Sequence, residues 1–302
     1  MSGNRRPVRV TAVVPAYNRA AYLAEALDSA LAQGFEGLDV LVVDDGSTDG
    51  TPAVLDSYGD RIRRHRQENA GQSAAVNRGV ELARGDLVAL LDSDDAWLPG
   101  KLARQVPLLD ADPGADLLYA GVEYVDGEGR PLPDARRADR TPSGDVLGDL
   151  LRENFLRTPT VLFRRAAFLK AGGYDKDLKC VNDWDMWLRL ATGRRVLYDP
   201  APSARYRLHG GQAVRDRRRM AEERVTVLER HLPRIERDAP GQARRARHSL
   251  GTRLLKLARL DLREGRGDDA SARIARAVAL APSLRLEALR VRLAERFRRA
   301  RD

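Results

Sequence analysis

The sequence predicts an α/β fold in which a mostly parallel sheet is flanked by helices and followed by an α-helical C-terminal region. Short apolar, β-branched runs alternate with amphipathic helical patterns along the first half, and arginine-rich helical periodicity fills the last third. The chain has 302 residues, of which 43% are apolar, so it can bury a sizeable core as one large domain or two.

The first part of this fold is a strand, a helix and a second strand. Residues 9–15 (RVTAVVP) and 39–44 (DVLVVD) are apolar runs of strand length, and residues 20–34 between them carry apolar side chains at helical spacing. A third run, residues 86–91 (DLVALL), follows a helical stretch over 73–85. Runs that are apolar throughout indicate strands buried on both faces, as in parallel sheets.

The alternation of strand and helix loosens after the third strand. Residues 126–145 are rich in Gly, Pro and charged residues and predict a long surface loop. A strand is expected at 160–163 (TVLF), followed by a short helix, and residues 182–193 predict an amphipathic helix with Trp187 in the core. This looser pattern extends from Tyr119 to about residue 210.

Basic residues concentrate in the C-terminal region, and we predict two domains over residues 1–212 and 213–302. Residues 212–302 hold 25 Lys and Arg against 13 Asp and Glu, while the whole chain has a net charge of +9. This charge suits anionic lipid or nucleic acid, but a solvated helical face explains it as well, and we expect no nucleic acid partner. Residues 254–267 and 270–283 predict a helical hairpin. Helix breaks are predicted at Pro233, 240–241, 265–267 and Pro282.

Several features bear on the cellular compartment. No run approaches the roughly 18 uninterrupted apolar residues of a membrane span, and the N-terminal residues pass into a strand pattern without the apolar core of a signal peptide. The single cysteine, Cys180, cannot form an internal disulfide. We therefore expect a cytoplasmic protein that contacts an anionic membrane peripherally, at its inner face, through the basic helices.

Polar and acidic residues follow the three predicted strands. They read PAYN at 15–18, DDGSTD at 44–49 and DSDD at 92–95. Ligands of open α/β sheets bind beyond the carboxyl ends of the strands, so these segments should border one crevice. The chain has no GxGxxG after the first strand and no Walker-type GxxxxGK[ST], which argues against dinucleotide and P-loop enzymes.

Three carboxylates within four positions, Asp92, Asp94 and Asp95, end the third strand. Like charges at this spacing repel one another unless a cation lies among them. Mg²⁺ or Mn²⁺ takes one or two protein carboxylates while substrate phosphates and waters complete its coordination, so the cluster indicates a phosphate-bearing ligand. The alternative is a solvated acidic turn in which Asp95 caps a helix that begins near Leu98.

The ordered motifs resemble family 2 glycosyltransferases with the GT-A fold, which is Rossmann-like. They are VVPAYNRAAYLAEALDSALAQ, VVDDGSTDGT, ENAGQSAAVNRGVELARGD, LLDSDD, FRRAAFLKAGGYD, NDWDMWLRL and YRLHGGQ, over roughly residues 8–212. The resemblance implies a metal-dependent glycosyltransferase of the hexosyltransferase type. Such an enzyme moves a sugar from a nucleoside diphosphate donor to an acceptor hydroxyl with inversion at the anomeric carbon.

The resemblance assigns the acidic strand end to the metal and the donor. Asp94 would be the principal ligand of Mn²⁺ or Mg²⁺, and Asp92 would reach the ribose or a metal-bound water. His209 matches a histidine that approaches the metal or the diphosphate late in the chain. A bound cation would stabilise the charge that grows on the leaving diphosphate.

The nucleotide would lie against the first two strand ends. The resemblance places Asp45 at the base, where a carboxylate accepts the ring N–H of uracil, and Tyr17 and Pro15 beside the base or ribose. A uridine or thymidine diphosphate sugar follows as the donor. Asp44 would be a more buried acceptor for backbone amides.

The helix after the second strand end matches the part of the family that lies near the diphosphate, through Asn77 and Gly71. Many relatives carry arginine before that asparagine, whereas this chain has Val76. Positive charge at the diphosphate would then come from Arg78.

The family places its catalytic base in an acidic pair that matches Asn182 and Asp183, so Asp183 is the predicted base and Asp185 a second candidate. A base must lie within hydrogen-bond reach of the acceptor hydroxyl. Trp184 would supply an apolar wall beside the base or stack on an acceptor sugar. Burial of this kind would make an aspartate a better base.

Three classes of function stay open. The first is a glycosyltransferase that acts on a cell-surface polysaccharide, glycolipid or glycoprotein. The second is a nucleotidyltransferase with a related acidic metal site, although the chain lacks an N-terminal glycine-rich loop with a basic residue for a triphosphate. The third is a non-catalytic basic module that binds membrane or nucleic acid through residues 213–302.

Overall fold

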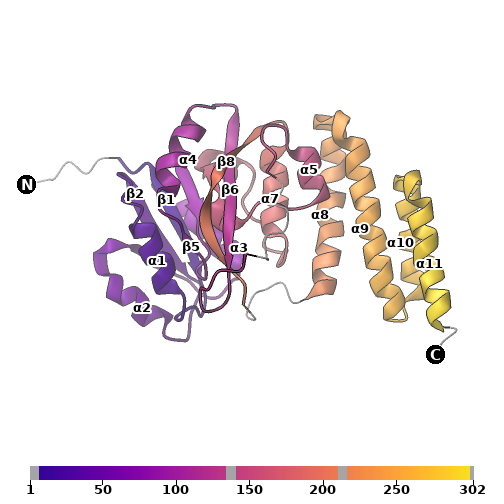
Figure 1. Cartoon of the computed structure of the whole chain (residues 1–302), viewed down its shortest axis with the longest axis horizontal. Coiled ribbons are helices and arrows are strands. Elements are labelled where there is room, and N and C mark those ends of the chain that lie inside the picture. The colour runs from indigo at the N-terminus through magenta and orange to yellow at the C-terminus, as the bar shows by residue number, and fades with distance from the viewer. Residues whose placement is uncertain (1–6, 134–140, 210–215, 300–302) are drawn as a thin grey trace, which may run out of the picture. The chain divides into compact units, whose positions relative to one another are not determined.

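The computed structural model of the chain describes residues 7–133, 141–209 and 216–299. The chain divides into two compact units (Figure 1). The sheet unit comprises residues 1–146 and 155–212, and the helical unit comprises residues 147–154 and 213–302. Residues 147–154 thus belong to the helical unit although sheet-unit segments flank them in the sequence.

The sheet unit is built on one mixed sheet, which has eight strands among the described residues, in the order β3-β2-β1-β4-β7-β6-β8-β5. The first four strands in this order pair in parallel, and β7 joins β4 antiparallel. The strands are β1 Val10–Ala16, β2 Leu38–Asp44, β3 Arg63–Arg66, β4 Leu87–Leu90, β5 Ala96–Trp97, β6 Ala115–Val125, β7 Leu162–Arg164 and β8 Arg195–Arg207.

Helices connect and flank these strands (Figure 1). Each carries an apolar face that the sheet buries, as in α1, where the side chains at positions 23, 26, 27 and 30 are buried at helical spacing. The helices are α1 Leu23–Leu31, α2 Thr51–Tyr58, α3 Gln72–Leu82, α4 Lys101–Asp110, α6 Arg165–Lys170 and α7 Asn182–Ala191, and short 3₁₀ turns cover Gly59–Arg61 and Thr158–Thr160.

The three strands predicted from apolar runs are β1, β2 and β4, and their parallel pairing is confirmed. The predicted strand at 160–163 and the helix at 182–193 are also present, as β7 and α7. Strand β3 was not predicted, because Arg63–Arg66 reads RRHR and alternates half-buried with exposed residues at the edge of the sheet. Apolar periodicity gives no signal for such an edge strand.

Helix α3 lies very close to β1, which fixes the segment that follows β3. A Cβ atom added at Gly79 would lie 2.3 Å from Cγ1 of Val13, so only glycine fits between the helix and the strand. After the helix ends, a Cβ atom on Gly85 would lie 2.8 Å from backbone atoms of Arg9 and Thr11. These contacts set α3 with its N-terminus at the edge where β1, β2 and β4 end.

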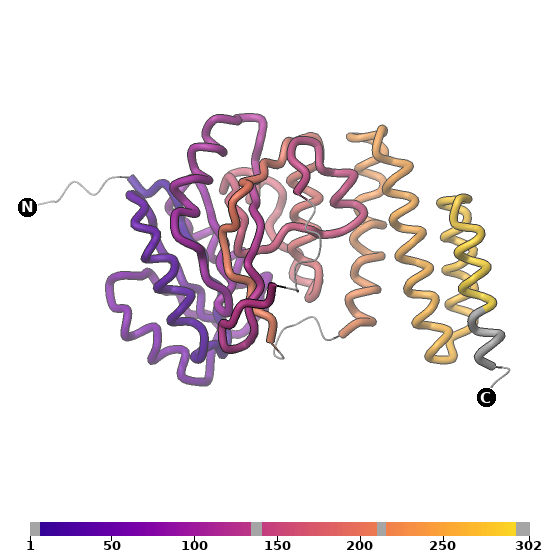
Figure 2. The backbone as a smooth tube through the Cα atoms, viewed as in Figure 1, coloured from indigo at the N-terminus to yellow at the C-terminus, as the bar shows by residue number. Residues whose placement is uncertain are grey.

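The helical unit is a set of packed helices whose long members are amphipathic (Figure 2). The predicted hairpin is α9 and α10, which pack side by side. The helices are α5 Leu147–Arg152, α8 Arg217–Asp238, α9 Ala243–Arg263, α10 Gly267–Leu280 and α11 Arg285–Arg299, with 3₁₀ turns at Pro240–Gln242 and Pro282–Leu284. Among the described helices, none is both long and apolar enough to cross a bilayer.

The predicted helix break at Pro233 is wrong, because α8 runs through this residue from Arg217 to Asp238. The proline removes one backbone hydrogen bond, but buried Val227 and Leu228 before it and Ile235 after it keep the helix packed on both sides. The breaks near 240, 265 and 282 are confirmed, since helices end and restart there.

Candidate functional site

The loops that follow β1 and β2 are joined by side chain to backbone hydrogen bonds. The backbone N–H of Asn18 donates to Oγ of Ser47 at 3.0 Å, and the side-chain oxygen of Asn18 accepts from the N–H of Thr48 at 2.8 Å. Asn18 adopts a positive φ of 52°, which this residue type tolerates better than most. The first two strand ends therefore form one continuous rim.

Asp44, the last residue of β2, is 2% exposed and stabilises the loop that follows this strand. It accepts from the backbone N–H of Ser47 at 2.9 Å and from the guanidinium of Arg66 on β3. Asp44 is thus the buried acceptor of backbone amides that the sequence suggested.

Asp45 is equally buried, at 3% exposure, and holds the segment before α3. Its Oδ1 accepts from Nε2 of Gln67 at 2.7 Å and from the N–H of Ala70 at 3.0 Å, and its Oδ2 accepts from the N–H of Gly71 at 2.8 Å. A carboxylate has about four acceptor positions, so these three bonds leave one position on Oδ2.

Asp92, at the end of β4, meets the same segment. Nε2 of Gln72 donates to Oδ1 of Asp92 at 3.1 Å, and the residue before it, Gly71, bonds Asp45. Asp45 and Asp92 therefore flank the Gly71–Gln72 peptide at the N-terminus of α3. The structure thus brings the three polar strand ends together at one edge of the sheet.

Asp94 and His209 lie in hydrogen-bond contact although 115 positions separate them. Nε2 of His209 is 2.9 Å from Oδ2 of Asp94, and the two side chains are only 10% and 14% exposed. Nε of Arg19 lies 3.7 Å from the same carboxylate oxygen, and the ring of Tyr22 lies 5.1 Å from the His209 ring. Asp94 is therefore enclosed by a histidine and an arginine.

Asp95 differs from Asp94 in its bonding partner and is 3% exposed. Its Oδ1 accepts from the backbone N–H of Arg207 at 2.8 Å. The alternative in which Asp95 caps a helix near Leu98 is wrong, because α4 begins at Lys101 and its N-cap is Gly100. Asp95 thus joins residues 92–95, called the acidic loop below, to the end of β8.

Arg207, on β8, makes further bonds to the acidic loop. Its buried guanidinium donates to the backbone carbonyls of Asp94 at 2.9 Å, Asp126 at 3.3 Å and Gly127 at 3.1 Å. It also pairs with Glu25 on α1 and lies 5.0 Å from the ring centre of Tyr22. Arg207 thus ties the acidic loop to residues 126–127 and to the start of α1.

The carboxylates of the cluster act on one another. Burial, followed by the charges of Asp94 and Asp183, raises the pKa of Asp92 to about 7, against the lowering effect of Gln72 and Arg19. Burial, followed by the charges of Asp183 and Asp92, also raises the pKa of Tyr174 well above its ordinary value. The field of Asp183 therefore reaches Asp92, which places the predicted base within the same acidic cluster.

Asp183 is half-buried in the first turn of α7. Its Oδ1 accepts from the N–H of Trp184 at 2.7 Å. Its neighbour Asn182 donates from Nδ2 to Oγ of Ser73 at 2.8 Å, which attaches the start of α7 to α3. The second candidate base, Asp185, is 6% exposed and paired with Arg189 one turn later, so it is already committed to an ion pair.

The two tryptophans of α7 are both core residues. Trp187 is fully buried, as predicted, and Trp184 is 2% exposed. An acceptor sugar has no access to a side chain this deeply buried, so the structure offers no stacking surface at Trp184.

The remaining predicted residues lie around the rim. Tyr17 is 45% exposed just after β1, whereas Pro15 is buried within the strand. Both side-chain atoms of Asn77 bond the backbone of Tyr174, at 2.9 Å and 2.7 Å, so Asn77 holds the loop before α7. Arg78 pairs with Glu81 at 3.3 Å, whereas Nε of Arg19 lies 3.7 Å from the carboxylate of Asp94.

The described residues contain no group of three His, Cys, Asp or Glu side chains arranged to hold a metal ion. The pair Asp94 and His209 nevertheless fits a divalent cation that binds together with a diphosphate. One carboxylate oxygen and one imidazole nitrogen would leave the other positions for phosphate oxygens and water, the usual pattern for Mg²⁺ and Mn²⁺ at phosphate sites. An imidazole in the donor set favours Mn²⁺ over the harder Mg²⁺.

Sequence reasoning did not assign a role to three residues of this site: Arg19, Gln72 and Arg207. Arg19 and Gln72 stand inside quoted motifs, directly after PAYN and before SAAVN. Arg207 stands two positions before His209 in YRLHGG. A charged or polar residue inside a motif was the available signal, but the partners of these three residues lie 20 to 182 positions away and only the fold reveals them.

Comparison with known proteins gives matches to both sequence and structure. The model of the family described as "Glycosyl transferase family 2" matches residues 11–171. A protein of Rickettsia typhi named an uncharacterized glycosyltransferase is 32% identical over 219 residues, which cover 71% of this chain and 68% of that protein. Across five such rickettsial relatives, the match spans 30% to 68% of their length.

Two solved structures share the fold. S. aureus TarS 1-349 in complex with UDP-GlcNAc has a TM-score of 0.69 at 20% identity and covers 95% of this chain and 88% of its own. The mannosyltransferase PcManGT from Pyrobaculum calidifontis, in complex with GDP-Man and Mn²⁺, has a TM-score of 0.64 at 24% identity and covers 96% and 81%. These neighbours confirm the predicted GT-A-like fold with a C-terminal helical region.

Proposed function

The chain belongs to glycosyl transferase family 2 and is a glycosyltransferase, and from this premise we propose that it transfers a sugar from a uridine or thymidine diphosphate donor to an acceptor hydroxyl with inversion. The observation that carries the proposal is the contact of Asp94 with His209, 2.9 Å apart, at the same edge of the sheet as Asp45 and Asp92. A metal-bound diphosphate suits such an edge.

The base and ribose of the donor would lie at the rim formed by the first two strand ends. The remaining acceptor position on Oδ2 of Asp45 suits the ring N–H of uracil or thymine. Tyr17, 45% exposed, would stack beside the base, and buried Pro15 would shape the floor beneath it. Asp92 would face the ribose or a metal-bound water.

Asp94 and His209 would hold Mn²⁺ or Mg²⁺ together with the diphosphate. When bound, the cation supplies positive charge that stabilises the nucleoside diphosphate as it leaves. The guanidinium of Arg19, 3.7 Å from Asp94, already lies where it would add to that charge. Asn77 would act indirectly, because its side chain holds the loop at Tyr174.

Asp183 would take the proton of the acceptor hydroxyl while that oxygen attacks the anomeric carbon. The bond from the anomeric carbon to the diphosphate oxygen breaks, and its electron pair leaves with the nucleoside diphosphate. Buried Trp184 next to Asp183 excludes water on one side, which favours a carboxylate that accepts protons more readily.

The acceptor that fits this activity is a cell-surface polysaccharide, glycolipid or glycoprotein. We place the transfer chemistry in residues 1–212 and a membrane contact in residues 213–302. Helix α11 supports that contact, since Leu286, Leu289 and Leu293 are 72%, 51% and 40% exposed beside arginines of the same helix. Exposed leucines with flanking cations suit an anionic membrane surface.

A donor screen tests the proposal. Release of nucleoside diphosphate from UDP-, dTDP- and GDP-sugars is measured with Mn²⁺ and with EDTA, and turnover of a uridine or thymidine donor only with Mn²⁺ is expected. Asp183→Asn should lower kcat by at least about 100-fold with donor affinity unchanged, because the base acts only on the acceptor. Asp177→Asn, which removes an exposed carboxylate of the preceding loop, is the matched control. Equal rates in both variants would refute the role of Asp183.

A further inference from the structure

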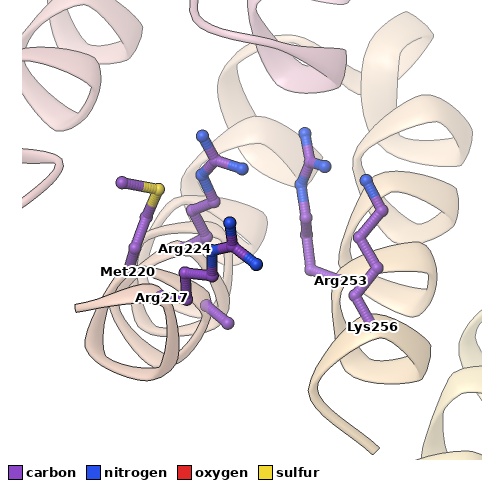
Figure 3. Close-up of a pocket in the computed structure, with 6 residues that line it drawn as sticks. Arg217, Met220, Arg224, Arg253 and Lys256 are labelled. Atoms are coloured by element: carbon purple, nitrogen blue, oxygen red, sulfur yellow. The ribbon is translucent and has the colours of Figure 1, made fainter. Parts of the chain in front are cut away.

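The helical unit contains a cavity of about 120 Å³ lined by Arg217, Met220, Ala221, Arg224, Arg253 and Lys256. The first four of these residues come from α8, at spacings that place them on one face of the helix, and the last two come from successive turns of α9. Figure 3 shows the charged ends of the two arginines of α8 and of the arginine and lysine of α9 on the same side of the two helices. Four cationic side chains thus border one small space, with their carbon stems along its wall and their charged ends gathered on one side.

The cavity cations differ from those arginines of the helical unit that are held in ion pairs. Arg218, Arg273 and Arg276, for example, pair with carboxylates. Within the described part of the chain, no carboxylate lies within ion-pair distance of Arg217, Arg253 or Lys256. The positive charge at the cavity is therefore not neutralised by direct ion pairs of these three residues.

Arg253 is the buried member of the cluster, at 9% exposure. Its guanidinium donates to the backbone carbonyl of Arg152 on α5, while its Nε has no hydrogen-bond partner among the described residues. A buried N–H donor without an acceptor destabilises the protein by about 1–3 kcal/mol, so an acceptor oxygen from a ligand would be favourable at this group.

The positive charges at the cavity repel one another. Burial, followed by the charge of Arg224, lowers the pKa of Arg253, and burial with the charges of Arg253 and Arg224 lowers that of Lys256. Glu153 and Glu287 act in the opposite direction on Lys256, but their effect is weaker. An anion in the cavity would remove this repulsion.

We propose that this cavity is a binding site for a phosphate monoester group. Planar guanidinium groups match phosphate oxygens in pairs, and the lysine adds a point charge. The volume is well below the roughly 300–1,000 Å³ of pockets for drug-sized ligands, so the cavity suits a phosphate group rather than a whole nucleotide or sugar. Met220 and Ala221 provide an apolar side that a bare, fully hydrated anion would not need.

The test uses the full chain in EDTA at low ionic strength, with inorganic phosphate titrated by calorimetry. The double variant Arg217→Gln with Lys256→Gln removes two exposed cations of the cavity, and the matched control Arg244→Gln with Arg263→Gln removes two exposed cations of α9 outside it. We expect binding by the wild type and the control, and binding at least about tenfold weaker in the cavity variant. Both variants should melt at the wild-type temperature, since all four residues are exposed.

A sedimentation assay identifies the source of the phosphate group. Vesicles of phosphatidylcholine alone are compared with vesicles that also contain phosphatidic acid. Loss of phosphatidic acid binding in the cavity variant alone assigns the site to a lipid head group, and unchanged vesicle binding assigns it to a phosphate group in solution. Absence of phosphate binding, or equal losses in the two double variants, would overturn the proposal and leave the transferase site untouched.

Discussion

Arg207 gives the sharpest test of how the acidic loop is held. Its side chain is 3% exposed and donates to the carbonyls of Asp94, Asp126 and Gly127. Arg207→Met keeps much of the apolar stem but removes every one of these donors. Three partly buried carbonyls lose their partner at about 1 kcal/mol each. The pair with Glu25 adds at most about 1 kcal/mol, because Glu25 is 46% exposed.

The expected loss is therefore about 3–4 kcal/mol in the free energy of unfolding, measured by urea denaturation of the full chain. Arg205→Met on the same strand is the control. Arg205 is 50% exposed and lies 3.8 Å from a half-exposed Glu123, so its replacement should cost less than about 0.5 kcal/mol.

The same substitution should disturb nucleotide binding. Arg207 bonds the backbone of Asp94 and stands two residues before His209, so both proposed metal ligands lose their support. Binding of UDP with Mn²⁺ should weaken at least about tenfold in Arg207→Met and stay unchanged in Arg205→Met. A variant at Arg207 that unfolds within about 1 kcal/mol of the wild type and binds UDP normally would refute the reasoning.

Three further predictions concern the acidic cluster, the packing of α3 and the helical unit. Folding raises the pKa of Asp92 from 3.8 to about 7, so the folded state favours the protonated carboxyl. Without metal, the contribution of this protonated carboxyl to the free energy of unfolding is fully present below pH 3.8 and is lost as the pH rises through 7. In EDTA the melting temperature should fall from pH 5 to pH 8 in the wild type and less in Asp92→Asn, and equal falls would contradict this pKa. Gly79→Ala should cost about 1–3 kcal/mol in urea unfolding, because its Cβ would lie 2.3 Å from Val13, whereas Gly241→Ala, with open space around it, should be near neutral. Asp261→Asn should cost about 3 kcal/mol, because this fully buried carboxylate pairs with Arg218, Arg266 and Arg273, and a loss below about 1 kcal/mol would count against that network.

The sequence was sufficient for elements whose residues are buried on a regular period. Strands β1, β2 and β4 are mostly apolar, and α7 carries Trp184, Trp187 and Leu188 at helical spacing. Strand β3 and the helix through Pro233 were not predictable in this way. The first is polar because it lies at a sheet edge, and the second is held by tertiary packing that overrides the local effect of proline.

The candidate site shows the same limit. Its acidic residues could be predicted, because a cluster of carboxylates at a strand end is unusual in the local sequence. The groups that arrange them could not, since Arg207 reaches Asp94 across 113 positions and Glu25 across 182. The side chain of Asn77 bonds the backbone of Tyr174, and Trp184 is buried in the core. Both features depend on how α7 and the loop before it pack, and no local sequence pattern encodes this packing.

The central claim is that Asp94 and His209 hold a divalent cation that binds the donor diphosphate. A crystal of the wild-type protein soaked with UDP and Mn²⁺, with anomalous scattering measured for manganese, tests it most directly. The account predicts one manganese peak in contact with Asp94 and His209, with the diphosphate bound to it and the uracil near Asp45. Manganese bound elsewhere, or a diphosphate bound away from this edge of the sheet, would contradict it.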